Sequence, residues 1–210
     1  MKSSKSIKSA AAVLVAVFTI IATPLTVLAK TDVYTVQKGD SLWIIAKKYR
    51  VGISEIVGAN PQFKDPNLIY PGDKVYVPLD DPELVSLEEQ VVALVNKERA
   101  KQGLAPLAIN WQVARVARYK ANDMRDKKYF DHTSPTYGSP FDMLKKFNVA
   151  YRNAGENIAK GQKTAADVVR AWMNSEGHRK NIMSPTFTEI GVGYSAGNST
   201  TYWAQLFIRP

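Results

Sequence analysis

The chain has 210 residues, which is too long for one small module and about right for a targeting segment, a small domain and a medium-sized domain. Its 45% hydrophobic and 22% charged residues are ordinary for a globular protein and exclude a disordered or fibrous chain. The net charge of +9 is spread along the sequence rather than gathered in one basic stripe, so we expect no nucleic-acid partner. A spread positive charge suits contact with anionic wall polymers or acidic lipids.

Residues 1–29 have the pattern of an export signal. A Lys-rich stretch without acidic residues is followed by an apolar run from Ala10 to Ala22, and then by the small-residue pattern that ends in Ala29. We therefore predict a signal peptide that is cleaved after Ala29, which makes the protein secreted. An uncleaved membrane anchor is the alternative, because Ala10 to Leu28 is nearly long enough to span a bilayer. The chain has no Cys, so its stability must come from packing rather than from disulfides.

Residues 32–79 are predicted to form a small domain with the order strand, helix, helix, strand. Ser41 and Ser54 each precede an apolar run and are expected to cap the two helices. The four elements are expected at residues 33–36, 42–49, 54–58 and 74–77.

Several motifs occur in order along this small domain: Tyr34-Thr35-Val36, Lys38-Gly39-Asp40-Ser41-Leu42-Trp43, Ile45-Ala46, Asn60-Pro61, Leu68-Ile69-Tyr70-Pro71-Gly72 and Val77-Pro78. Together they resemble a LysM domain over its full length. The resemblance implies a βααβ fold that binds glycans containing N-acetylglucosamine, such as peptidoglycan. It also implies a shallow groove between two loops, lined by Gly39, Asp40, Ser41, Leu42, Asn67, Leu68, Ile69 and Tyr70. Core positions are the alternative for Leu42, Trp43 and Ile69, and for Trp43 we expect the core.

A short acidic segment at residues 80–85 is predicted as a linker, too short to hold the two domains far apart. Residues 86–210 form the second domain. The capping-box pattern at residues 86–89 predicts a first helix that ends around Gly103. Further helices are expected at residues 110–126, 140–147 and 164–175, and strands at residues 155–159, 189–195 and 201–208. This order favours an α+β fold in which helices pack on the faces of an antiparallel sheet.

The chain has two histidines, His132 and His178, and any imidazole chemistry must use them. Glu156 and Glu176 are the accompanying candidate carboxylates. Such a set could hold a divalent ion with an open coordination position, or it could provide a carboxylate–imidazole pair for proton transfer. From residue types alone, a structural role for each histidine and a solvated position for Glu176 stay open.

A second series of motifs runs through the larger domain: Val95-Asn96-Lys97-Glu98-Arg99, His132-Thr133-Ser134-Pro135, Gly155-Glu156-Asn157-Ile158-Ala159, Ser175-Glu176-Gly177-His178-Arg179 and Gly191-Val192-Gly193-Tyr194. They resemble the bacterial, cysteine-free branch of the CAP superfamily, also called SCP-like or cysteine-rich secretory proteins. The resemblance implies an α-β-α sandwich with a cavity ringed by His132, Glu156, Glu176 and His178. These four residues are the candidate metal ligands and the candidate catalytic residues. Zinc is the expected metal, because the set offers nitrogen and oxygen but no thiolate.

Two functional hypotheses follow, since this fold alone does not give an activity. In the first, an exported cell-wall-associated protein binds peptidoglycan through LysM and presents the CAP cavity to a divalent metal or to a small ligand such as a lipid or peptide. In the second, the CAP domain is a metal-dependent hydrolase at the wall or spore cortex, with Glu156 or Glu176 as base. A Ser134 nucleophile beside His132 is a weaker variant, because the sequence indicates no buried acid partner for it. A role in sporulation is compatible with the LysM resemblance.

Overall fold

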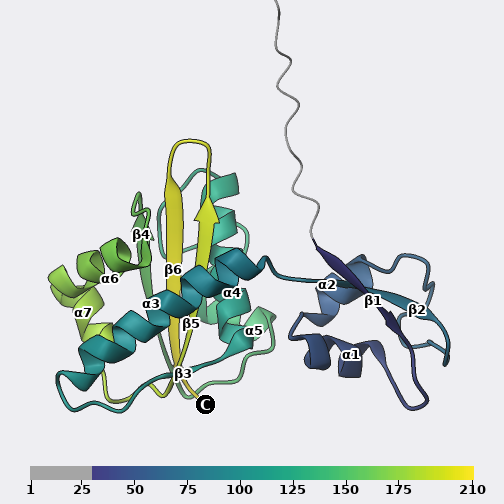
Figure 1. The fold of residues 1–210 in the computed structure, drawn as a ribbon. Coiled ribbons are helices and arrows are strands. Elements are labelled where there is room, and N and C mark those ends of the chain that lie inside the picture. The colour runs from purple at the N-terminus through teal and green to yellow at the C-terminus, as the bar shows by residue number, and fades with distance from the viewer. Residues whose placement is uncertain (1–29) are drawn as a thin grey trace, which may run out of the picture.

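The computed structural model describes residues 30–210, which form a small N-terminal domain followed by a larger C-terminal domain (Figure 1). The predicted signal peptide at residues 1–29 and its cleavage site after Ala29 lie outside the described residues. Across residues 30–210, no helix combines the length and the apolar character that crossing a membrane requires.

The N-terminal domain has the predicted βααβ order. Its elements are β1 (Thr31–Thr35), α1 (Leu42–Tyr49), α2 (Ile53–Gly58) and β2 (Lys74–Pro78). The two strands pair antiparallel, with Val33 opposite Tyr76. The buried side chains that join the helices to this sheet include Leu42, Ile45, Ile56, Val75 and Val77.

Two predictions for this domain are wrong in detail. Trp43 was expected in the core, but it is 58% exposed. The buried positions of α1 are Leu42, Ile45 and Ala46, and Trp43 lies off that apolar stripe because each residue turns the helix by about 100°. The second helix is capped by Gly52 rather than by Ser54, whose hydroxyl instead donates to Glu55.

The C-terminal domain is a four-stranded sheet between two layers of helices. Its helices are α3 (Pro82–Ala100), α4 (Trp111–Asp126), α5 (Pro140–Lys146), α6 (Ala165–Asn174) and α7 (Glu176–Ile182). Its strands are β3 (Ala108–Ile109), β4 (Asn153–Lys160), β5 (Glu189–Ala196) and β6 (Thr201–Arg209), in the order β3-β5-β6-β4. Strand β6 pairs antiparallel with both β5 and β4, and β3 runs parallel to β5.

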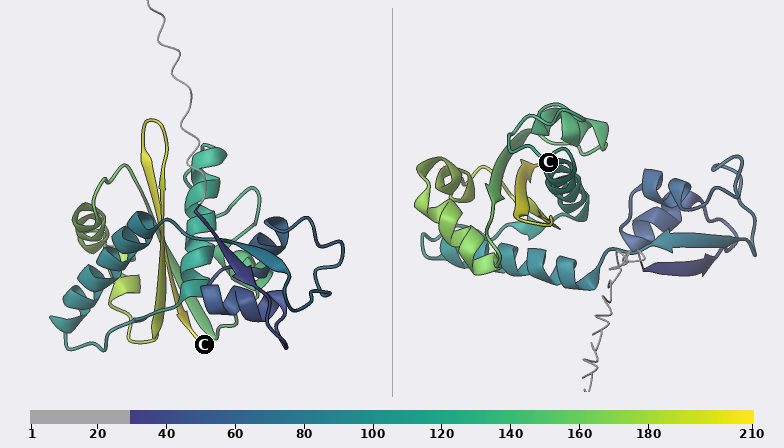
Figure 2. Two further views of the ribbon diagram at one scale, coloured as in Figure 1. Left: turned by 45° about the vertical axis from the view of Figure 1, so that its right-hand side comes forward. Right: turned by 90° about the horizontal axis from the view of Figure 1, so that it is seen from above.

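Seen from above, α4 and α5 cover one face of the sheet while α3, α6 and α7 cover the other (Figure 2). Two hydrophobic clusters correspond to these two layers. One contains Trp172 and Ile182 from α6 and α7, and the other contains Met124 and Met143 from α4 and α5. The predicted α-β-α sandwich is therefore confirmed.

Two glycines of β5 allow α4 to lie directly on the sheet. A Cβ atom added at Gly191 would lie 2.1 Å from the backbone nitrogen of Ala114, and one added at Gly193 would lie 2.2 Å from the carbonyl carbon of Ala117. Because real Cβ atoms do not approach backbone this closely, the close packing of α4 on β5 depends on glycine at both positions.

The first helix of the larger domain begins earlier than predicted. Helix α3 begins at Pro82 rather than Ser86, and the side chain of Asp81 caps it by accepting a hydrogen bond from Glu83 N–H. Proline suits the first turn of a helix, where its missing N–H is not needed. Most of the predicted linker at residues 80–85 is thus the first turn of α3. Helix α7 and the short strand β3 were not predicted.

The two domains touch, as their short connection predicts. Arg115 on α4 donates to Glu55 and to the hydroxyl of Ser54 in the small domain. Arg118, one turn further along α4, contacts both Asp80 of the connection and Glu88 of α3.

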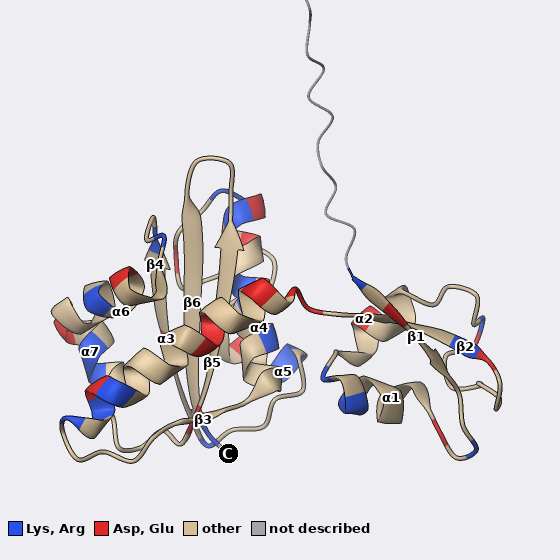
Figure 3. Ribbon diagram, in the orientation of Figure 1, with Lys and Arg blue, Asp and Glu red and all other residues tan. Residues whose placement is uncertain are grey.

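Charges of both signs are interspersed along α3 and α6 (Figure 3), in keeping with a spread rather than a concentrated charge.

Candidate functional site

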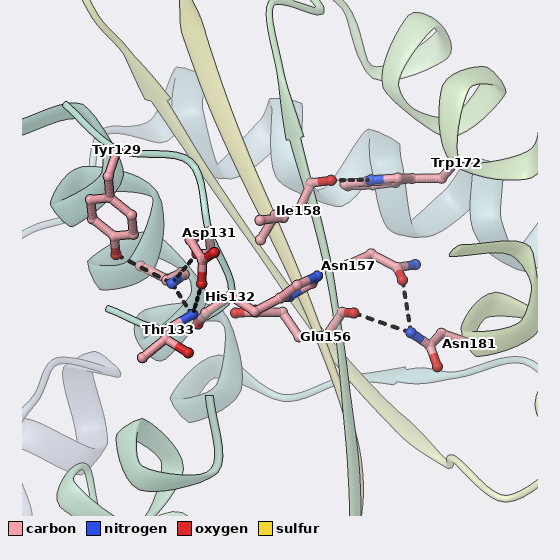
Figure 4. Close-up of polar contacts among 10 residues, drawn as sticks. Tyr129, Asp131, His132, Thr133, Glu156, Asn157, Ile158, Trp172 and Asn181 are labelled. Carbon is pink, nitrogen blue, oxygen red and sulfur yellow. Dashed lines mark hydrogen bonds and ion pairs between the residues drawn. The ribbon is translucent and has the colours of Figure 1, made fainter. Parts of the chain in front are cut away.

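The candidate site of the larger domain is built around a hydrogen bond between His132 and Glu156 (Figure 4). His132 lies in the loop after α4, and Glu156 lies on β4. Nδ1 of His132 is 2.7 Å from Oε1 of Glu156. The Glu156 side chain is 2% exposed and the His132 side chain is 55% exposed, so a buried carboxylate holds an imidazole that solvent can reach.

The contact with Glu156 changes the pKa of His132. The hydrogen bond to Glu156 raises the pKa of His132 above its usual value, against burial and the positive charge of Lys120, which both lower it. A histidine with a raised pKa keeps its proton closer to neutral pH. The pair can therefore hold or deliver a proton at the surface of the domain.

His178 is held near this pair by a set of amide side chains that were not predicted as site residues. Asn157 Nδ2 donates to the backbone oxygen of His178 at 3.1 Å, and Asn181 Nδ2 donates to Asn157 Oδ1 at 2.8 Å. Asn181 also donates to the backbone oxygen of Glu156 at 3.1 Å, which ties α7 to β4 beside the site. Burial lowers the pKa of His178, and the charge of His132 lowers it further.

The structure places Glu176, the fourth residue of the predicted set, on a different surface. It is exposed at the start of α7 and lines a hollow of about 600 Å³ together with Glu98, Met173 and Arg179. None of His132, Glu156 or His178 lines that hollow. The fold thus brings His132 and Glu156 into contact, places His178 beside them, and leaves Glu176 apart.

These residues do not fit a preformed divalent-metal centre. Within the part of the chain that the structure describes, no group of three or more His, Asp or Glu side chains is arranged to hold a metal ion. Because Nδ1 of His132 is engaged by Glu156, only Nε2 of that ring is left for an ion, which is a single ligand. The other carboxylate oxygen of Glu156, Oε2, is buried and has no hydrogen-bond partner among the described residues. The arrangement suits hydrogen bonding and proton exchange better than metal coordination.

Ser134 is fixed in a turn and is not placed as a nucleophile. It is 3% exposed, and its hydroxyl donates to Asp123 Oδ2 at 2.6 Å. The Ser134 Oγ atom also accepts hydrogen bonds from the backbone N–H groups of Thr136 and Tyr137. Asp123 is thus the buried acid partner that the sequence did not reveal, but the contact stabilises the loop after α4.

In the small domain, the two loops of the predicted groove lie side by side. Val36 N–H donates to the backbone oxygen of Asp73, and Gly72 N–H donates to that of Val36. The residues predicted to line the groove divide into two groups. The side chains of Asp40, Ser41, Leu42 and Ile69 serve the domain itself, through loop and cap hydrogen bonds or core packing.

The second group is open to solvent. Leu68 is 55% exposed and Tyr70 is 59% exposed. Gly39 is exposed with a φ of +93°, a conformation that favours glycine. Asn67 is exposed and its amide group contacts Asp65. Two apolar side chains and exposed loop backbone therefore remain available to a ligand.

The comparisons with known proteins agree with this architecture. The profile of the cysteine-rich secretory protein family, CAP, matches residues 92–207, and the LysM domain profile matches residues 34–78. The chain belongs to the cysteine-rich secretory protein (CAP) family and carries a LysM domain in front of its CAP domain.

Three relatives give the range of similarity. YkwD of Bacillus subtilis (strain 168) is 63% identical over 121 residues, which are 58% of this chain and 46% of YkwD. SpoIVD-associated factor A of the same organism is 52% identical over 46 residues, 22% of this chain and 12% of that protein. The crystal structure of an extracellular protein with an SCP domain from Bacillus anthracis str. Ames superimposes with a TM-score of 0.57 at 36% identity, covering 67% of this chain and 47% of that one. The chain thus spans less than half the length of each of these relatives.

Proposed function

We propose that this protein is exported to the bacterial cell wall, where its LysM domain binds peptidoglycan and its CAP domain presents the His132–Glu156 site to a small ligand. The observation that supports glycan binding is the exposure of Leu68 and Tyr70 beside the loop after β1. Apolar side chains can cover the face of a sugar ring, while loop backbone groups can bond its N-acetyl group. The family membership and the extracellular relative from Bacillus anthracis support the location.

Binding to purified peptidoglycan tests the first half of the proposal. In a pelleting assay with residues 30–210, Tyr70→Ala should weaken binding about tenfold, which corresponds to the loss of roughly 1.4 kcal/mol of contact. The matched control is Tyr76→Ala, because Tyr76 is a similarly exposed tyrosine, 45%, that lies on β2 rather than in the groove loops.

Equal losses in the Tyr70 and Tyr76 variants would contradict groove binding. Binding that disappears at high salt in every variant would do so as well, because screening weakens general charge attraction far more than contacts in a groove.

The solvent-accessible ring of His132, whose Nδ1 is engaged by Glu156, leaves Nε2 to accept a hydrogen bond from a ligand such as an amide or a hydroxyl group. A lipid headgroup or a peptide satisfies this requirement. Saturation-transfer NMR with a series of short amides and glycerolipid headgroups identifies the class, and signals that persist in Glu156→Gln would argue against this site.

The metal-dependent hydrolase is the second candidate function, and the exposed ring of His132 is the observation that favours it, because metal-ligating imidazoles usually have a carboxylate on their other ring nitrogen. Calorimetry of zinc into residues 30–210 tests its first requirement, with His132→Ala and His178→Ala as the site variants. A role in sporulation is a narrower proposal, supported by the short similarity to SpoIVD-associated factor A. Following the protein by immunoblot through growth and spore formation tests that role.

A further inference from the structure

Lys120 is a fully buried lysine directly beneath the His132 loop. It lies on α4, with 0% of its surface exposed. A buried lysine is uncommon, because desolvation disfavours the charged ammonium unless its donors are all matched. Its surroundings therefore determine whether the lysine acts as a charge.

Three acceptors surround the Lys120 ammonium. Nζ lies 2.7 Å from the backbone oxygen of Asp131, 2.7 Å from that of His132 and 3.2 Å from the hydroxyl of Tyr129. An ammonium has three N–H donors, so the acceptors match the charged form one for one. Tyr129 in turn donates to Asp123 Oδ2 at 2.7 Å, and this carboxylate also fixes the loop through Ser134.

The charge of Lys120 reaches the candidate site. Glu156, Asp123 and Asp131 are the carboxylates that face Lys120, and each acts to raise its pKa against the lowering effect of burial. In the opposite direction, the positive charge of Lys120 lowers the pKa of His132. Lys120 therefore contacts the backbone of His132 directly and interacts electrostatically with both His132 and Glu156.

We infer that Lys120 is the resident cation of the His132–Glu156 site: it positions the His132 loop and supplies, as part of the fold, the positive charge that a divalent metal would otherwise bring to Glu156. A metal ion entering the site meets an ammonium that cannot move away, because three hydrogen bonds fix it. The site is consequently selective for neutral or anionic hydrogen-bonding ligands and against divalent cations. This inference rests on the proposed function only in taking His132 and Glu156 as the ligand site.

Zinc calorimetry on charge variants of the full described chain tests the inference. Lys120→Gln removes the charge and keeps a hydrogen-bond donor, and it should bind zinc at least about tenfold more tightly than the wild type. Lys120→Arg keeps the charge and should bind as weakly as the wild type. Lys127→Gln is the matched control, since Lys127 is an exposed lysine at the end of the same helix, and it should change nothing.

Adding His132→Ala to Lys120→Gln should abolish the gain, which places the ion at this site rather than elsewhere. Equal zinc affinity in the wild type and Lys120→Gln overturns the inference, and this includes the absence of binding by both. If the Lys120 variants lose the native circular dichroism spectrum, the zinc affinity of the wild type alone tests the inference. Zinc binding tighter than millimolar that His132→Ala removes would then overturn it, and millimolar or weaker binding supports it. Failure here leaves peptidoglycan pelleting unaffected, so the two proposals fail independently.

Discussion

Arg115 of the CAP domain donates two hydrogen bonds to Glu55 of the LysM domain. Its Nη2 lies 2.6 Å from Oε2, and its Nε donates to Oε1. The guanidinium also lies 4.7 Å from the ring centroid of Phe147 and 5.6 Å from that of Tyr119. Gly52 leaves room for it, because a Cβ atom there would lie 2.2 Å from Cζ of Arg115. Arg115 is thus held by an ion pair, by two aromatic rings and by the space beside Gly52, which together make a specific interface between the domains.

Arg115→Ala should destabilise the protein by roughly 1–3 kcal/mol, because it leaves a half-buried carboxylate without its charged partner. Urea unfolding should then separate into two transitions as the domains uncouple. Arg170→Ala is the control, since its ion pair with Asp167 is largely exposed, and it should cost at most about 0.5 kcal/mol. Equal effects of the two substitutions would show that the domains do not depend on the interface.

Gly193→Ala should destabilise the CAP domain by about 1–3 kcal/mol or more, because the new methyl group would collide with the backbone of α4 at Ala117. Thermal unfolding measures the loss. Gly177→Ala is the counterpart, since nothing lies within 4 Å of a Cβ atom there, and it should be neutral or stabilise α7. A harmless Gly193→Ala would mean that α4 does not pack on β5 as closely as the structure has it.

Glu88 should make stability depend on pH near neutrality. Burial raises the pKa of Glu88 to about 7, despite the opposing contacts with Arg118 and the N–H of Tyr194. Because the folded state holds this proton more tightly than the unfolded chain, the stabilisation is fully present below about pH 4.3 and is lost as the pH rises through about 7. The free energy of unfolding should therefore fall more steeply from pH 5 to pH 8 in the wild type than in Glu88→Gln.

The control for this slope is Glu89→Gln, which changes the next residue of α3, an exposed glutamate. That variant should keep the wild-type pH dependence. If Glu88→Gln also keeps it, the carboxylate of Glu88 stays ionised across this range and Arg118 outweighs burial.

Glu156→Gln should lower the pKa of His132, because it removes the charged hydrogen-bond partner that raises it. The contribution of the pair to stability is present below about pH 6.5 and is lost as the pH rises through the folded pKa of His132. NMR titration of the imidazole protons measures the shift, and the sequence has two histidines, so His178→Ala assigns both signals. A His132 signal that titrates identically in both proteins would disprove the pairing.

Local sequence rules predicted the elements whose ends carry side-chain caps. Ser41, Asn110 and Thr164 accept backbone hydrogen bonds at the starts of α1, α4 and α6, as expected for their residue types. Helix α7 was missed because its cap, Ser175, makes no side-chain hydrogen bond and because Gly177 favours a loop. The start of α3 was misplaced because a Pro after an acidic residue fits a linker as well as a first helical turn.

The candidate site could be predicted only in part. His132 and Glu156 are 24 residues apart, and only the sheet order brings the loop after α4 against β4. Glu176 lies in the same motif as His178, but residues two positions apart on a helix do not face each other, and Glu176 lines the hollow beside Glu98 and Met173. The sequence does carry a signal for Lys120. This lysine falls within the apolar stripe of α4, between Ala117 and Met124, where a lysine needs internal partners.

The position of β6 also sets the order in which the two domains can mature. Strand β6 lies between β5 and β4 in the sheet but follows both in the chain, so the sheet cannot close until residues up to Arg209 have emerged from the ribosome or a translocation channel. The LysM domain depends on no such late segment and can form while its neighbour is still incomplete. If the LysM domain binds peptidoglycan as proposed, that binding does not have to await the formation of the His132–Glu156 site.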